Sequence, residues 1–294
     1  MLYSKGKLIK KDFYTLPQAM YNLDEIEPIL INGNNSILHK TLNKSIINAE
    51  KIIISHSIVY VVNGDVKVST YNYDNISISN GEMLFMPRDS YLISDYISNN
   101  EKLEVYIFFF NYKIASDFLK TVTPKNKSIN NKLLKLSLSN NISHYFEALK
   151  NVKYKDIHNK QLLNSKLLEF LHLIAESNND FIDILYQVEM SNYKFNTEDY
   201  MIKHYDKNLT ISDWASLHGK SLSTFNRKFK KQYGISPKKW ILKQNMSIAY
   251  QMLSNGSSVS QCSVEFGYNN TSNFIKAYKE IYRITPKQHI KQQH

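Results

Sequence analysis

Between about residue 51 and residue 110, the hydrophobic residues come in short β-branched or aromatic runs separated by turn-forming residues. Asn63-Gly64-Asp65 lies between two of these runs, and Asn80-Gly81-Glu82 precedes another. Asn-Gly is a strong hairpin signal, because both residues tolerate a positive φ. Many short strands joined by glycine turns predict a small sandwich or barrel. The runs cover residues 52–54, 58–62, 66–71, 76–78, 83–86, 91–93 and 105–110, whereas residues 1–50 show no strong pattern.

From residue 111 to about residue 189 the hydrophobic period becomes helical. The clearest helix is expected over residues 161–176, where one face is fully apolar and three further leucines lie off that face. Such a helix must cover the barrel, pair with a second copy of itself, or both. The stripe is therefore a candidate dimerisation surface, with an intrachain core helix as the alternative. Its members are Leu163, Leu167, Phe170, Leu171 and Ile174.

The last hundred residues contain one pattern twice, at about 209–237 and at 258–286, joined by residues 238–257. Each copy consists of a capped amphipathic helix, a glycine turn, a second helix rich in polar residues, and a Ser/Thr-Pro stop. Two helix-turn-helix units held at a fixed distance can read two segments of a DNA groove. The pattern predicts an all-α DNA-binding domain.

Caps and periodicity define the helices of the first copy. Thr210 and Asp213 have the spacing of a short capping box, and Gly219 is placed to end that helix. The second helix, which Ser221 or Ser223 can cap, is expected to have an apolar side that includes Leu222 and Phe225. Its opposite side is polar and basic, as a helix that faces DNA requires.

Charge is distributed unevenly and agrees with this interpretation. Residues 196–294 contain 15 Lys and Arg against 6 Asp and Glu, whereas residues 1–195 contain 22 against 20. A nearly neutral first part and a basic last third indicate that the C-terminal part meets a polyanion. The alternative, a generally basic solvated surface, is left open by charge alone.

The single cysteine, Cys262, excludes an intramolecular disulfide, and the N-terminal residues lack the apolar core of a signal peptide. No apolar run has the length of a membrane span. We therefore expect a cytoplasmic protein without a membrane partner.

At this point the sequence resembles the AraC/XylS family of transcriptional regulators. The resemblance depends on Ser221-x-Ser223-x-Phe225-x-Arg227-x-Phe229-Lys230-Lys231 followed by Gly234-Ile235-Ser236-Pro237. It continues in Phe266-Gly267-Tyr268, Ser272-x-Phe274, Tyr278-Lys279 and Ile284-Thr285-Pro286. The runs VYVVNGDVKV and NGEMLFMPRDSYLIS are similar to the cupin-like barrel of such regulators. The closest likeness is to the branch that activates type III secretion and other virulence genes.

The resemblance implies an α+β protein that regulates transcription, most often as an activator. Its N-terminal cupin-like barrel would occupy residues 1–110, a helical dimerisation or linker region 111–192, and the DNA-binding domain 193–294. The implied partners are double-stranded promoter DNA, RNA polymerase, a second copy of the chain, and an effector of the N-terminal domain, either a small molecule or a protein. No cofactor is implied.

In this family the outward face of the second helix of each unit, called here the reading helix, enters the major groove. Arg can bind guanine, Asn can pair with adenine, and hydroxyls can contact either base. Lysines near these helices are better placed for phosphate. The implied base-reading residues are Ser223, Thr224, Asn226, Arg227, Thr271, Ser272, Asn273 and Lys276; the phosphate residues are Lys220, Lys230, Lys231, Lys243 and Lys279.

Three positions depart from the family pattern. Asn245 replaces a usual Arg, Cys262-Ser263 replaces a usual Ile-Ala pair, and Arg283 replaces the Gly expected before the final Thr-Pro. If that last turn needs a positive φ, Arg283 is an unfavourable residue there. These changes leave the fold expectation intact and weaken the expectation that the second unit reads bases with ordinary stringency.

Catalysis finds no support in the sequence. Cys262 falls on the inward face of a short helix, as a core thiol does. His39 and His56 could hold a metal in a cupin-like barrel only with a cluster of further ligands on facing strands. The alternatives to a sequence-specific regulator are a non-specific architectural DNA binder and a cupin-type enzyme with an appended DNA-binding domain.

Overall fold

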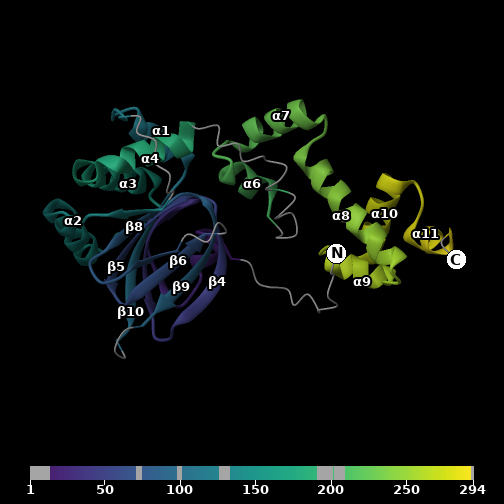
Figure 1. The fold of residues 1–294 in the computed structure, drawn as a ribbon, viewed down its shortest axis with the longest axis horizontal. Helices are drawn as coiled ribbons and strands as arrows, with labels where there is room; N and C mark the ends of the chain where they lie inside the picture. Colours follow the sequence, from purple (N-terminus) through teal and green to yellow (C-terminus); the bar gives the residue numbers. More distant parts are fainter. Residues whose placement is uncertain are drawn as a thin grey trace. The chain divides into compact units, whose positions relative to one another are not determined.

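The computed structural model describes residues 14–70, 75–97, 101–125, 133–190, 201 and 209–292, without the side chains of Tyr14 and Met190. The chain divides into two compact units. The first is Met1–Phe195 together with Ser216–Lys220, and the second is Asn196–Ala215 together with Ser221–His294. Figure 1 shows strands together with helices in the first unit, and helices in the second. The α+β class expected from the sequence is confirmed.

The first unit contains two sheets. The five-stranded sheet has the order β1-β4-β9-β6-β7 and the six-stranded sheet the order β11-β8-β5-β10-β3-β2. Apart from the parallel β1–β4 pair, neighbouring strands are antiparallel. The strands are β1 (Tyr14–Leu16), β2 (Ile26–Asn32), β3 (Asn35–Leu42), β4 (Ile46–Ile53), β5 (His56–Asn63), β6 (Asp65–Thr70), β7 (Asn75–Ile78), β8 (Met83–Met86), β9 (Asp89–Tyr96), β10 (Leu103–Phe110) and β11 (Leu134–Leu136).

Strand β10 explains why the chain's most apolar short run is a strand. Alternate side chains, from Leu103 to Phe109, enter the core between the two sheets. On the opposite face Tyr106, Phe108 and Phe110 enter a second core, and the half-buried Glu104 near the start of the strand is the one polar residue. A strand buried on both faces has no polar side, so it reads as a continuous apolar run.

Helices cover the outer face of the six-stranded sheet and form the second core with it. Phe170 of α3 stacks on Phe108 of β10 with ring centroids 4.0 Å apart. Glu189, near the end of α4, accepts a hydrogen bond from Arg88 and lies 2.6 Å from His56 Nε2. The helices are α1 (Tyr112–Leu119), α2 (Asn140–Asn151), α3 (Lys160–Ser177) and α4 (Asn179–Met190), and a 3₁₀ turn covers Gln18–Met20.

The predicted dimerisation stripe on α3 is wrong. Its five residues are completely buried within the single chain, so they cannot form a surface between copies. They pack against the sheet and the neighbouring helices, because α3 crosses the apolar face left by β10. The alternative, an intrachain core helix, is confirmed. The corrected residues are Leu163, Leu167, Phe170, Leu171 and Ile174.

The hairpin expected at Asn63-Gly64-Asp65 is also wrong, although the turn itself exists. Strand β5 pairs with β8 and β10, whereas β6 pairs with β7 and β9, so the turn leads from one sheet to the other. Gly64 has φ +93°, and an added Cβ would lie 2.7 Å from the Tyr96 carbonyl oxygen. A glycine is needed here by both the turn and the close approach of a neighbouring strand.

Some strands gave no clear sequence signal. Strands β1, β2 and β3 lie in the first fifty residues, and β11 lies in the region expected to be helical. Strand β11 has three residues and pairs with β8 alone among the described strands. Segments this short are stabilised by their place at a sheet edge rather than by local pattern.

The second unit is helical, as expected. The helices of this part of the chain are α6 (Ile211–Leu217), α7 (Leu222–Tyr233), α8 (Pro237–Ser254), α9 (Val259–Glu265), α10 (Thr271–Tyr282) and α11 (Pro286–Gln292).

Among all the helices that the structure describes, in both units, none has the length and apolar character needed to span a membrane.

Candidate nucleic-acid interface

The first helix-turn-helix unit consists of α6 and α7. The predicted capping box of α6 is confirmed, since Thr210 N donates to Asp213 Oδ2 at 2.9 Å and Asp213 N donates to Thr210 Oγ1 at 3.1 Å. Ser221 caps α7 by accepting from Thr224 N, and Gly234 ends it at φ +74°. These local bonds fix where the reading helix begins and ends.

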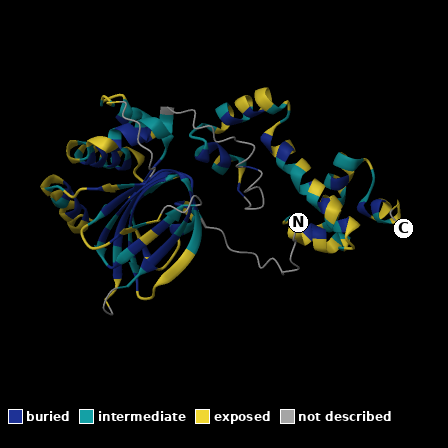
Figure 2. Cartoon of the chain, in the orientation of Figure 1, coloured by how far each residue is buried: buried dark blue, intermediate teal, exposed yellow. Residues whose placement is uncertain are grey.

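Helix α7 has one buried and one exposed side, as Figure 2 shows. Phe225 and Phe229 are buried, whereas Ser223 and Arg227 are exposed. Thr224 and Asn226 are half-buried, and the Asn226 amide donates to the Leu222 carbonyl at 2.9 Å. Arg227 is therefore the predicted base-reading residue of this helix with the longest free reach.

Leu222 corrects one detail of the sequence prediction. It was placed on the apolar side of α7, but its side chain is 47% exposed. Leu222 is the first residue of the helix, where neighbouring helices leave its side chain exposed. Helical period alone cannot show how far a terminal residue is covered.

The second unit consists of α9 and α10. Ser258 and Gln261 form a full capping box at the start of α9, and Asn270 caps α10. Phe274 and Tyr278 are completely buried with Cys262, which confirms the prediction of a core thiol at Cys262. Ser272, Asn273 and Lys276 are exposed on α10, and Thr271 is half-buried.

The two units occupy equivalent positions along the chain. Ser223 and Ser272, Phe225 and Phe274, and Arg227 and Lys276 are each 49 residues apart. Helix α8 connects the units; with 18 residues it is roughly 27 Å long. Its buried residues Met246, Ala249 and Leu253 contact the core of the second unit. The repeat thus presents a cation at the same place on each reading helix.

The predicted phosphate residues differ in exposure. Lys230, Lys231, Lys243 and Lys279 are exposed. Lys220 is half-buried, and its Nζ donates to the His218 carbonyl at 3.4 Å. Four of the five lysines are thus free to reach a polyanion as the chain stands.

The two histidines weighed as metal ligands have other neighbours. His39 Nε2 lies 3.0 Å from Glu104 Oε1, and its other ring nitrogen faces Glu27. His56 Nε2 lies 2.7 Å from the Arg88 guanidinium and 2.6 Å from Glu189 Oε1, so a fixed positive charge stands where a metal would bind. Burial, followed by the Arg88 charge, lowers the pKa of His56. No cluster of three or more His, Cys, Asp or Glu suited to a metal occurs in the described part of the chain.

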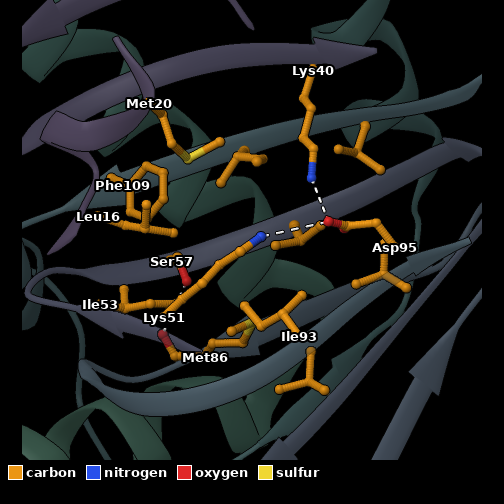
Figure 3. Close-up of a pocket in the computed structure, with 15 residues that line it drawn as sticks. Leu16, Met20, Lys40, Lys51, Ile53, Ser57, Met86, Ile93, Asp95 and Phe109 are labelled. Atoms are coloured by element: carbon orange, nitrogen blue, oxygen red, sulfur yellow. Dashed lines mark hydrogen bonds and ion pairs between the residues drawn. The ribbon is translucent and has the colours of Figure 1, made fainter. Parts of the chain in front are cut away.

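A small cavity inside the barrel contains a buried charge cluster (Figure 3). Lys40 Nζ donates to Asp95 Oδ2 at 2.6 Å, and Lys51 Nζ lies 3.5 Å from the same oxygen. Burial, followed by the Lys51 charge, lowers the pKa of Lys40 to about 8. Burial alone would raise the pKa of Asp95, but the two ammonium groups hold it below its ordinary value. The cavity has a volume of about 30 Å³, which suits about two waters.

Comparison with known protein families finds one match in the N-terminal part of the chain and another in the C-terminal part. A model described as the ExsA N-terminal regulatory domain matches residues 56–184, and one described as a helix-turn-helix domain matches residues 214–292. The chain belongs to the AraC/XylS family of transcriptional regulators. The resemblance stated from the sequence is thereby confirmed, and the chain is a DNA-binding regulator.

Two AraC/XylS relatives illustrate the range of similarity. The HTH-type transcriptional regulator ExsA of Pseudomonas aeruginosa is 33% identical over 88 residues, which is 30% of this chain and 32% of ExsA. The virulence regulon transcriptional activator VirF of Yersinia enterocolitica is 25% identical over 75% of this chain and 82% of VirF. A crystal structure of apo ToxT from Vibrio cholerae is 13% identical, with a TM-score of 0.47, covering 90% of this chain and 100% of that one.

Proposed function

We propose that this AraC/XylS-family chain activates transcription by placing α7 and α10 in successive major grooves of promoter DNA. The observation that supports this most is the repeat itself. Both reading helices expose short polar side chains and a cation at matching positions, while two aromatic residues of each are buried. A merely basic surface requires no such correspondence between two helices.

The side chains suit base recognition. Arg227 carries the planar fork that can donate two hydrogen bonds to guanine, and Asn226 and Asn273 carry the amide that can pair with adenine. Successive major grooves on one side of a duplex are about 34 Å apart, which is comparable with the roughly 27 Å length of α8 plus the width of its neighbours. The half-buried Thr224 and Thr271, with Ser223 and Ser272, complete the base-reading set.

The exposed lysines suit the DNA backbone. Lys230 and Lys231 follow Arg227 in the last turn of α7, and Lys279 holds the corresponding place on α10. Contacts to phosphate fix the register of a protein on DNA without selecting a sequence. Lys243 and Lys220 would add to the same non-specific attraction.

Activation is supported by the names and extent of the relatives. VirF, a virulence regulon activator, aligns with most of the chain, and ExsA gives its name to the matching N-terminal model. Control of virulence or secretion genes and contact with RNA polymerase in the cytoplasm follow from that likeness as parts of the proposal.

Homodimerisation and an effector also belong to the proposal. A dimer must use a surface other than the buried stripe of α3. A small-molecule effector inside the barrel would have to enlarge a cavity that now suits about two waters. A protein effector that binds the outside of the unit needs no such change. Sedimentation of the purified chain tests the dimer directly.

Selection of genomic DNA fragments with the purified chain, followed by footprinting, tests the main proposal. We expect a protected site with two recognised segments about one helical turn apart, upstream of the gene for this protein or of others. Transcription from that promoter with purified RNA polymerase should rise when the chain is added. Equal affinity for the selected site and for random DNA at fixed salt would favour the architectural alternative. A stoichiometric metal in the purified chain would favour the enzyme alternative.

A further inference from the structure

Each reading helix packs against the helix that follows it, and the side chains that make this contact differ chemically between the two units. Trp240 and His289 hold equivalent places in the repeat, each three residues after the proline of a Ser/Thr-Pro stop. In the first unit Trp240 meets Phe229 edge to face, with ring centroids 6.2 Å apart. In the second unit His289 meets Tyr278, whose ring is 6.1 Å away and nearly parallel. An apolar pair has thus been replaced by a polar one.

The polar pair belongs to a chain of hydrogen bonds through three helices. The Tyr278 hydroxyl of α10 and His289 Nδ1 of α11 are 2.6 Å apart, and His289 Nε2 is 3.4 Å from Ser254 Oγ of α8. The Ser254 hydroxyl donates to the Tyr250 carbonyl at 2.9 Å, so at His289 its oxygen acts as acceptor. His289 therefore donates from Nε2 and accepts the Tyr278 proton at Nδ1.

Burial makes this arrangement specific. Tyr278 is completely buried, and His289 is 2% exposed. Burial raises the pKa of Tyr278, so its hydroxyl keeps the proton that it donates. Tyr250 of α8 stacks on the His289 ring with centroids 4.0 Å apart, which fixes the plane of that ring. Unlike an apolar contact, a buried hydrogen bond is lost when one partner rotates, so it selects one orientation.

That orientation matters for reading because Tyr278 lies between the outward-facing cations of α10. Lys276 precedes it by two residues, and Lys279 follows it directly. Helix α10 also ends without a glycine, since its C-cap is Arg283 at φ +64°. Rotation of α10 about its axis would move Lys276 and Asn273 relative to a base edge, whereas α7 is held by apolar packing and a glycine cap.

We propose that His289 is a positioning residue, acting through Tyr278 to fix the rotation of α10 and hence base discrimination in the second half of the DNA site. The inference rests on the proposed function, because it assumes that α10 reads bases.

Tyr278→Phe is the sharpest test, because it removes one hydroxyl and keeps the ring. His289→Phe removes the acceptor and keeps an aromatic ring. Tyr282→Phe is the matched control: its hydroxyl, also on α10, donates to the Met246 carbonyl of α8 at 3.2 Å. Each full-length variant is titrated with single-base variants of the footprinted site, and its thermal unfolding is recorded.

In Tyr278→Phe and His289→Phe we expect discrimination in the second half of the site to fall by about two- to tenfold, the equivalent of one hydrogen bond. Discrimination in the first half should stay unchanged, and the double variant should lose no more than either single variant. Tyr282→Phe should keep both halves.

Three results would overturn the inference. The first is unchanged discrimination in the second half in both variants, and the second is an equal loss in both halves, which indicates general destabilisation. The third is a loss of discrimination in Tyr282→Phe as well, which would assign the effect to either tyrosine hydroxyl of α10 rather than to the link with His289. A wild-type chain that shows no base preference at all would refute the proposed function instead.

Discussion

The two helix-turn-helix units have the same helical framework, but they differ in the residue that ends the reading helix and in the cation that it exposes. Both reading helices bury two aromatic residues, and both end at a left-handed residue, Gly234 in one and Arg283 in the other. The first unit presents Arg227, whereas the second presents Lys276 at the same place. The repeat keeps two buried aromatic positions on each reading helix, whereas the anchoring residue, the helix end and the exposed cation differ between the units. This difference predicts unequal halves in both stability and recognition.

The largest expected effect concerns the cores. Phe274 is completely buried among Met246, Leu253 and Tyr278, so Phe274→Ala should lower the free energy of unfolding by roughly 3–5 kcal/mol. Phe225 is 3% exposed, and Phe225→Ala should cost an amount near the lower end of that range. Denaturant unfolding followed by circular dichroism measures the loss of helix. Tryptophan fluorescence reports the unfolding of the first helix-turn-helix unit separately, because the chain's two tryptophans are Trp214 and Trp240. A smaller loss in Phe274→Ala than in Phe225→Ala would reverse the comparison.

Recognition should be unequal too. Arg227→Ala is expected to cost about 1–3 kcal/mol on the true site and to relax base preference at one position, with little change on random DNA. Lys276→Ala should cost less and should lower both affinities together, because an ammonium group is a point charge without a fork. Titration with single-base variants measures both. If Arg227→Ala keeps every wild-type preference, Arg227 contacts phosphate or has a structural role, and our assignment is wrong.

The helix ends give a smaller effect of opposite sign in the two units. Arg283 adopts φ +64°, a region that costs a residue with a Cβ about 1–2 kcal/mol relative to glycine. Arg283→Gly should therefore raise the stability of the second unit by about 1 kcal/mol, and Gly234→Ala should lower that of the first by a similar amount. Thermal unfolding measures both. Destabilisation by Arg283→Gly would mean that the Arg283 side chain makes a contact worth more than the backbone strain.

The smallest and most symmetrical effect is expected at the phosphate contacts. Lys230→Ala and Lys279→Ala should each lower the slope of log K against log salt by about 1, equally on specific and random DNA. Lys150, exposed on α2 and outside both helix-turn-helix units, provides the control, and Lys150→Ala should leave the slope unchanged. An unchanged slope in either test variant would remove that lysine from the interface.

Local signals account for the part of the structure that the sequence predicted well. Capping residues such as Thr210 with Asp213 act within one turn, so their bonds can be inferred from spacing. The positive φ suspected at Arg283 was inferred in the same way, from a glycine missing at a known turn. The repeat supplied a second copy of each signal and so made the family evident.

Where partners come from distant parts of the chain, less of the structure could be predicted from the sequence. Leu171 belongs to an apolar stripe that suits a dimer or a core equally well, and only the packing of α3 on the six-stranded sheet decided between them. The sheets separated β5 from β6, although the turn at Gly64 looked like a hairpin. The hydrogen bond between Tyr278 and His289 joins two different helices, so the periodicity of neither helix predicts it.

By itself, the sequence determined the helices of the C-terminal unit, their caps, the charge that favours DNA, and the family, because these depend on neighbouring residues and on composition. Only the tertiary structure decided which apolar faces are used inside the chain, which buried charges are paired, and how the second reading helix is held. Burial and hydrogen bonding between distant residues depend on the whole fold, and a pattern along the chain records only that a side chain needs a partner, not which partner it finds.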